Sequence, residues 1–228
     1  EAGLHAEGSF EPVDRQMFSP PLETRTWFHL GPVGPEHGDW HEADLSHEYW
    51  PGDPQLLARP PEFRAFLEDG DVPRRVKRDA VRSLRGRILR SELYALDSTG
   101  CQDRRYAVSE SSYGVRPEPS PLSTPQNPCP IFFPYTLAQR TTQWERCDDP
   151  MTQVAFTEDY DEYGQPRTRI QIACPRGWRA ADDVPGEPYL TTRSEIVYAR
   201  PGDPQVYIMD RVASTTTYEI KNDGSQRL

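Results

Sequence analysis

Aliphatic residues and long apolar runs are scarce in this sequence. No stretch of 18 apolar residues occurs, which excludes a membrane-spanning helix. Leu, Ile, Val and Phe together make up about 18% of the 228 residues, below the roughly 20% at which disorder becomes plausible. Aromatic residues reach 11%, however, and disordered chains are poor in them. With 24 prolines, the composition predicts an ordered chain of short extended segments and turns around a thin core.

Motifs of common catalytic centres are also missing. The sequence contains no G-x-S-x-G elbow, no P-loop and no G-x-G-x-x-G, so we assign no catalytic residue, cofactor or metal ligand. A net charge of −10 argues against a nucleic-acid partner, which requires a basic surface. No charged segment followed by an apolar one marks a signal peptide at the N-terminus. Because the chain does not begin with Met, we expect it to be part of a longer protein.

The cysteines do not identify a compartment. Cys101, Cys129, Cys147 and Cys174 lie far apart and form neither a C-x-x-C motif nor the spacing of a zinc finger. Their disulfide state therefore stays open.

Alternating and aromatic segments predict a mainly β fold made of antiparallel hairpins. One region, 60–86, is predicted to be helical, because prolines precede two short amphipathic segments and Gly86 suits a helix end. A loop is predicted at 116–130, which holds six prolines. Residues 51–54 (Pro-Gly-Asp-Pro) are interpreted as a plain turn. The predicted strands are 24–29, 87–96, 106–113, 141–146, 152–157, 167–173, 190–199 and 206–220.

Two acidic segments resemble metal sites without meeting their requirements. The segment 29–48 is rich in His and acidic residues, but His41-Glu42 is followed by a second histidine only at His47, whereas zinc proteases need H-E-x-x-H. A metal-dependent hydrolase is thus a weaker alternative than a polar surface segment. Residues 158–164 resemble a calcium loop, yet Ile170 would occupy its last ligand position, so we interpret them as a turn between strands. The candidate metal ligands are His29, Glu36, His37, Asp39, His41, Glu42, Asp44, His47 and Glu48.

The segment 74–90 carries the strongest charge feature. Eight basic residues fall within it and only Asp79 opposes them. Since the rest of the chain holds an excess of acidic residues, we interpret the segment as a basic face that contacts an acidic surface of the same parent protein, in preference to a foreign polyanion.

Aromatic residues offer one further alternative, a binding module. Trp27, Trp40, Tyr49 and Trp50 could contact a subunit, a receptor or a carbohydrate if they were exposed, whereas burial would favour a scaffold.

Seven motifs stand in a recognisable order, at 26–31, 48–53, 87–97, 106–110, 141–146, 148–153 and 159–167. Their order resembles the middle/C-terminal region of the Tc-toxin B component, an insecticidal toxin family of the TcdB/TcaC type related to SpvB. The similarity runs through residues 24–224, with 1–23 as an extended leader or linker and 225–228 as a truncated tail. Within it, 160–164 (Tyr-Asp-Glu-Tyr-Gly) resembles a YD-type turn, while Cys147 departs from the small residue expected there.

The resemblance implies a non-catalytic structural role in a secreted virulence factor. In this family the segment follows a β-propeller and precedes Rhs/YD repeats, and the B component with its C partner builds a hollow β-sheet shell. The shell encloses a cytotoxic effector and passes it to the pore of the A component. The implied partners are therefore the β-propeller and Rhs segments of the same subunit, the C component and the A component, without nucleic acid and without membrane insertion by this segment.

A shell wall agrees with the composition. A single layer of strands with two wet faces needs alternating polar residues and few aliphatic ones, and it gains stability by pairing with strands beyond its own edges. The turn signal at 222–224 (Asn-Asp-Gly) would then start a hairpin that continues past the given sequence.

Overall fold

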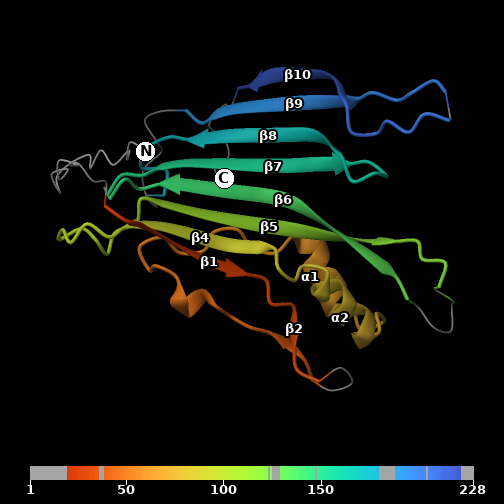
Figure 1. The fold of residues 1–228 in the computed structure, drawn as a ribbon, viewed down its shortest axis with the longest axis horizontal. Coiled ribbons are helices and arrows are strands. Elements are labelled where there is room, and N and C mark those ends of the chain that lie inside the picture. Colours follow the sequence, from red (N-terminus) through yellow and green to blue (C-terminus); the bar gives the residue numbers. More distant parts are fainter. Residues whose placement is uncertain are drawn as a thin grey trace, which may run out of the picture.

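A computed structural model describes residues 20–35, 39–122, 124, 129–146, 148–179, 188–203 and 205–221. It is mainly β, as predicted, with one large antiparallel sheet and two short α-helices (Figure 1). The turn signal at 222–224 and most of the segment 1–23 lie outside the described residues. The sheet strands are β1 (Leu22–Phe28), β4 (Ile88–Ala95), β5 (Ala107–Glu118), β6 (Ile131–Gln143), β7 (Met151–Tyr160), β8 (Pro166–Cys174), β9 (Leu190–Tyr198) and β10 (Val212–Ile220).

The eight strands are ordered β1-β4-β5-β6-β7-β8-β9-β10. Every neighbouring pair is antiparallel, so the chain runs back and forth across the sheet with β1 and β10 at its edges. Between β1 and β4 the chain leaves the sheet, and this excursion holds the two-residue strands β2 (Pro32–Val33) and β3 (His41–Glu42), the 3₁₀ turn Ser46–Glu48 and both helices. No described helix has the length and apolar character to cross a membrane.

The helices form a small apolar unit next to the ends of β5 and β6 (Figure 1). Helix α1 (Pro61–Glu68) has a proline in its first turn, and α2 (Arg74–Arg82) directly follows Pro73, as proline at a helix start favours. Both lie within the predicted region 60–86. Their buried residues pack with Tyr113 of β5, and Val115 and Phe132 flank this contact. The residues of this apolar core are Phe63, Ala80, Val81, Leu84 and Tyr113.

The strand register gives the sheet two chemically different faces. Successive side chains of a strand point to opposite sides, so each paired position can be assigned to one face of the sheet. In β5 and β6 the assignment ends at the bulge between Ser112 and Tyr113. One side, here called the neutral face, carries only two charged side chains at these positions, Arg169 and Glu219. Its Ser, Thr and Gln residues are Thr24, Thr26, Ser91, Ser109, Ser111, Gln139, Thr141, Gln143, Gln153, Thr157, Gln171, Thr192, Ser194, Thr215 and Thr217.

The opposite side, here called the charged face, holds most of the ionisable side chains of the ladder. The segment 48–58 lies on it over β4, β5 and β6 and hydrogen-bonds to side chains of these strands. The expectation of two wet faces is therefore wrong for this half of the sheet, because chain from the excursion excludes water there. The charged residues of this face are Glu23, Arg25, Arg90, Glu92, Glu110, Arg140, Glu158, Arg193 and Glu195.

The predicted loop 116–130 and the strand 141–146 need correction. Strand β5 continues to Glu118, and β6 begins at Ile131 and ends at Gln143, so 131–140 is strand and 144–146 is a turn. Pro117 and Pro134 lie in these strands where β5 and β6 pair only with each other, beyond the reach of β4 and β7. Proline is tolerated there because an edge strand needs no amide donor on its open side. Similarly, β10 starts at Val212 and not at residue 206.

Gly164 closes the turn between β7 and β8 and is expected to resist substitution. Its φ is +76°, and a Cβ atom there would lie 2.5 Å from Cζ of Phe133. Alanine at this position would have to adopt a left-handed backbone conformation and push the Phe133 ring aside. We therefore expect the free energy of unfolding to fall by about 1–3 kcal/mol. Chemical denaturation measures the change. Gly70→Ala is the control, because nothing lies within 4 Å of its added Cβ; equal effects of the two changes would contradict this account.

Candidate functional site: a buried ionic cluster

Charged side chains on three neighbouring strands form a row across the charged face. Arg90 of β4 is paired with Glu110 of β5, and Glu110 is paired in turn with Arg140 of β6. The three therefore alternate in sign along one line across the sheet. All are almost completely buried, which is rare for such residues unless they are paired.

The turn at 51–54 supplies the carboxylate that completes the row. Asp53 is fully buried, and its Oδ1 accepts hydrogen bonds from Nη1 of Arg140 and Nη1 of Arg179, both at 2.9 Å. The indole Nε1 of Trp144 donates to its Oδ2 at 2.8 Å. Its backbone carbonyl accepts a bond from Nη2 of Arg90 at 2.7 Å. The turn is thus fixed to β4 and β6 by both its backbone and its side chain.

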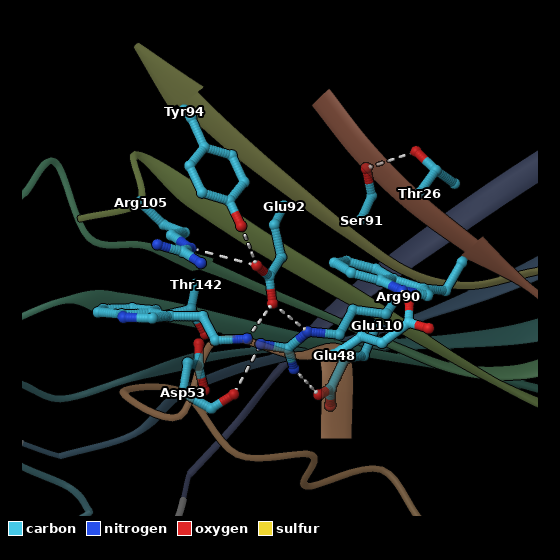
Figure 2. A network of polar contacts seen from close by, with 12 residues as sticks. Thr26, Glu48, Asp53, Arg90, Ser91, Glu92, Tyr94, Arg105, Glu110 and Thr142 are labelled. Carbon is cyan, nitrogen blue, oxygen red and sulfur yellow. Dashed lines mark hydrogen bonds and ion pairs between the residues drawn. The ribbon is translucent and has the colours of Figure 1, made fainter. Parts of the chain in front are cut away.

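Glu92 occupies the centre of the view in Figure 2 and has no free oxygen. Nε of Arg90 and the backbone amide of Trp50 donate to its Oε1 at 2.7 and 2.9 Å. The hydroxyl of Tyr94 and Nε of Arg105 donate to its Oε2 at 2.8 and 3.2 Å. Four donors from three parts of the chain therefore converge on one carboxylate.

Glu110 is saturated in the same way. Nη1 of Arg90 donates to its Oε1 at 2.5 Å, and Nε of Arg140 donates to its Oε2 at 3.1 Å. The backbone amides of Leu56 and Leu57 also donate to Oε2, at 3.1 and 3.3 Å. Nη2 of Arg140 lies 2.9 Å from Oε1, close enough for charge attraction but outside hydrogen-bond geometry.

Charge balance explains why the cluster tolerates burial. Three carboxylates face two fully buried guanidinium groups, those of Arg90 and Arg140, and two more at the margin, those of Arg105 and Arg179. A buried ion pair is favourable only when hydrogen bonds within the protein replace those lost to water. Here every carboxylate oxygen of the three acidic residues accepts at least one such hydrogen bond. The cluster ties the segment 48–58 to the sheet in place of an aliphatic core. We name the set of Asp53, Arg90, Glu92, Glu110 and Arg140 the ionic cluster.

The electrostatics of Glu92 predict sensitivity to acid. Burial alone would raise its pKa, but hydrogen bonds from the Trp50 amide, Tyr94 and Arg90 outweigh burial and lower the pKa. For Tyr94, burial and the bond to Glu92 raise the pKa to about 12, so its hydroxyl stays a donor. Because the pKa of Glu92 is lower in the folded state, its contribution to stability is complete above the ordinary glutamate pKa of about 4.3 and is lost as the pH falls through the lowered value.

We therefore expect the free energy of unfolding to decrease steeply below about pH 4.3. Asp161 adds to the slope: burial would raise its pKa, but the Gln165 and Tyr163 amides and Arg200 lower it. Urea denaturation at several pH values measures the slope, and Glu92→Gln should flatten it. An unchanged slope in that variant would contradict the assignment.

The ionic cluster offers little for catalysis. The described hydrogen bonds use both oxygens of each carboxylate, and arginine does not release its proton at physiological pH. Within the described residues, no group of three His, Cys, Asp or Glu side chains is placed to hold a metal ion. Cys101 and Cys174 carry free thiols in separate places, and burial raises the pKa of the Cys174 thiol to about 11, which makes it a weak nucleophile.

The described members of the 29–48 segment are separated by other contacts. Glu42 pairs with Arg59 at 2.7 Å, and Oε2 of Glu48 accepts a hydrogen bond from the indole of Trp27 at 2.6 Å. His29 is partly buried, which lowers its pKa, whereas the side chain of His47 is exposed. Glu36 and His37 lie outside the described residues. Among the described candidates, Nε2 of His47 lies 3.9 Å from Oε1 of its neighbour Glu48, but no three of them are placed to hold one metal ion.

The four candidate binding aromatics point mainly inward. Trp27 and Tyr49 are buried and meet edge to face at 5.2 Å between ring centroids. Trp50 is half-buried and packs against Trp144 in the same manner. Trp40 is also half-buried, below the guanidinium of Arg74. By the criterion set from the sequence, burial of these rings favours a scaffold over an aromatic binding surface.

The basic segment 74–90 divides into two parts. Arg90 belongs to the ionic cluster, and Arg87 lies over the ring of Tyr113 and donates to the carbonyl of Pro134. Arg82 and Arg85 remain exposed at and just after the end of α2. Arg90 pairs with Glu92 and Glu110 of this chain, in line with the expected contact with acidic groups of the same protein, but these groups are buried and do not form a surface.

The turn after β7 holds a further buried carboxylate, outside the ionic cluster. Oδ1 of Asp161 accepts hydrogen bonds from the amides of Tyr163 and Gln165 at 2.9 Å, and Nη2 of Arg200 donates to its Oδ2 at 2.7 Å. The predicted turn is confirmed for residues 161–164, whereas residues 158–160, which the prediction included, belong to β7. Asp161 also fixes the loop before β10 to this turn through Arg200.

Fold and site together define an antiparallel β-sheet protein in which a buried ionic cluster ties the excursion to the sheet beside a small apolar core. The chain belongs to the family described as the insecticide toxin TcdB middle/C-terminal region, whose model matches residues 79–224. This confirms the resemblance seen in the sequence. No curated protein matches the chain.

Solved structures share the fold at low sequence identity. A crystal structure of TcdB2-TccC3-Cdc42 matches with a TM-score of 0.63 at 22% identity, and one of TcdB2-TccC3 with 0.63 at 20%. The Tc holotoxin pore of Photorhabdus luminescens matches with 0.57 at 20%. Each match covers 88% of this chain but only 10% of the solved chain, so this chain spans about a tenth of those relatives.

Proposed function

We propose that this chain is a non-catalytic wall segment of a toxin-complex B component, which helps to form a hollow β-shell around a cytotoxic effector. The observation that carries the proposal is the eight-stranded antiparallel sheet of a TcdB-family chain, whose buried carboxylates are saturated by packing contacts. A wall needs such a sheet to be stiff and does not need reactive groups.

The open edges of the sheet support a place within a larger wall. β1 pairs only with β4 and β10 only with β9, so each has an unpaired side within the described structure. Every residue of β10 is exposed. An exposed strand edge readily pairs with another strand, and neighbouring segments of the same subunit would use both edges in this way.

The proposed partners follow from the family. The matched structures are complexes of TcdB2 with TccC3 and a Tc holotoxin pore. By analogy, this chain would contact the β-propeller and Rhs segments of its own subunit, work with a C component that supplies the effector, and deliver to an A-component pore outside the producing cell. This analogy with the matched complexes rests on the likeness of their folds to this chain.

Protease protection tests the enclosure. The B component that carries this chain would be co-expressed with a C component, and the purified complex would be treated with a nonspecific protease. We expect the effector to resist cleavage in the complex and to be digested once urea opens it. Equal digestion of the effector in the native complex and in the C component expressed alone would contradict the proposal.

A further inference from the structure

The neutral face carries fewer charged side chains than the composition of the whole chain would predict. Charged residues make up 27% of the chain, yet Arg169 and Glu219 are the two charged side chains at its paired positions, and alternation in β8 adds Arg167 near the start of that strand. The charged face of the same strands holds nine over a similar number of positions. Because successive side chains of a strand point to opposite faces, this difference in charge between the two faces is set by the fold.

Hydroxyl groups on the neutral face satisfy one another. The side-chain oxygens of Thr26 and Ser91 lie 3.2 Å apart between β1 and β4, and those of Ser194 and Thr217 lie 2.9 Å apart between β9 and β10. Such cross-strand pairs stabilise the sheet and leave fewer free donors and acceptors for a ligand.

A shallow groove crosses the same face over β6 to β9. It has a volume of about 360 Å³, and its lining is half polar and half apolar. The polar residues are Gln139, Thr141, Gln153, Gln171 and Thr192, and the apolar ones are Val154, Ala155, Ile172, Ala173 and Leu190. The groove contains no charged side chain among its lining residues. A lining without charged side chains gives the groove no electrostatic preference for acidic or basic segments of a polypeptide.

We propose that the neutral face is turned toward the interior of the shell and touches the enclosed polypeptide, while the charged face is turned outward. This inference rests on the proposed function. Fixed charges on an inner wall would attract oppositely charged residues of the cargo, and an extended apolar patch would bind an unfolded chain. A neutral, self-bonded surface does neither, so an effector of any charge could leave it.

The charged face has features of an outer surface. Arg193 and Glu195 are exposed on β9 and pair with each other at 3.3 Å, and the segment 48–58 thickens this side over β4 to β6. Surface charges of both signs keep an assembly soluble.

Two cysteine variants at nearly the same point of the sheet test the orientation. Gln171 and Arg193 are both exposed on adjacent strands but lie on opposite faces, since Gln171 pairs with Thr192 and Arg193 pairs with Ile170. With the native cysteines replaced by serine, Gln171→Cys and Arg193→Cys would each be introduced into the B component and assembled with its C component. The probe is a maleimide on a polyethylene glycol chain too large to enter a closed shell.

We expect Arg193→Cys to be labelled in the intact complex and Gln171→Cys to be labelled only after urea opens it. The reverse pattern would overturn the orientation and leave the shell in place, because one face would still be protected. Labelling of both thiols in the intact complex would overturn the enclosed shell itself. Thr192→Cys, the neighbour of Gln171 on the neutral face, replaces Gln171→Cys if that variant fails to assemble, as judged by size-exclusion chromatography.

Discussion

Replacing Arg140 with methionine is expected to lower the free energy of unfolding by about 3–5 kcal/mol, the usual cost of leaving buried charges without their partner. Arg140 donates to Asp53, Glu110 and Thr142 and is 1% exposed. Its loss would leave two buried carboxylates short of a counter-charge. Urea denaturation followed by tryptophan fluorescence measures the effect, because Trp144 shares Asp53 with Arg140.

Arg193→Met is the matched control. Its pair with Glu195 is exposed, and exposed pairs contribute about 0–1 kcal/mol. A double variant with Asp53→Asn then tests coupling: we expect the two changes at Asp53 and Arg140 together to cost less than the sum of each alone. Similar small losses for Arg140→Met and Arg193→Met would show that the ionic cluster does not stabilise the fold.

Replacing Leu84 with alanine is expected to cost about 2–5 kcal/mol, as for other buried leucines. Leu84 is 2% exposed within the apolar core formed by Phe63, Ala80, Val81 and Tyr113. This core joins both helices to β5, so the cavity would loosen them together. Circular dichroism at 222 nm during thermal unfolding reports on the helices.

Leu122→Ala provides the control for this change, because that leucine is 76% exposed. It should leave the melting curve almost unchanged, since surface substitutions away from special features stay within about 0.5 kcal/mol. If the two leucine variants melted at the same temperature, the small core would not be what holds the helices to the sheet.

Alternation and turn residues predicted most of the fold. The strands β7, β8 and β9 agree with their predicted ranges to within a few residues, because alternating polar and apolar residues set the period of a strand directly. The helices follow from the prolines that precede them. The end of β5 was missed because the prolines of 116–130 suggested a loop, and residues 131–140 at the start of β6 were assigned no strand. The strand order shows that Pro117 and Pro134 in these stretches lie at edges, where proline is tolerated.

The ionic cluster could not be predicted in the same way. Arg90 and Glu92 stand two residues apart, which places them on one side of a strand, but an exposed polar face produces the same pattern. The decisive partner, Asp53, lies in a turn whose composition is typical of a solvent-exposed corner, and it is 87 residues from Arg140. Burial here depends on register between distant strands and on the path of the segment 48–58, which local sequence does not specify.

Electron cryomicroscopy of the B component assembled with its C component tests the wall assignment most directly. We expect strands from neighbouring segments to continue the sheet beyond both β1 and β10, with the neutral face lining a closed cavity that contains density for the effector. An isolated sheet on the outside of the particle, with both edge strands unpaired, would contradict the account.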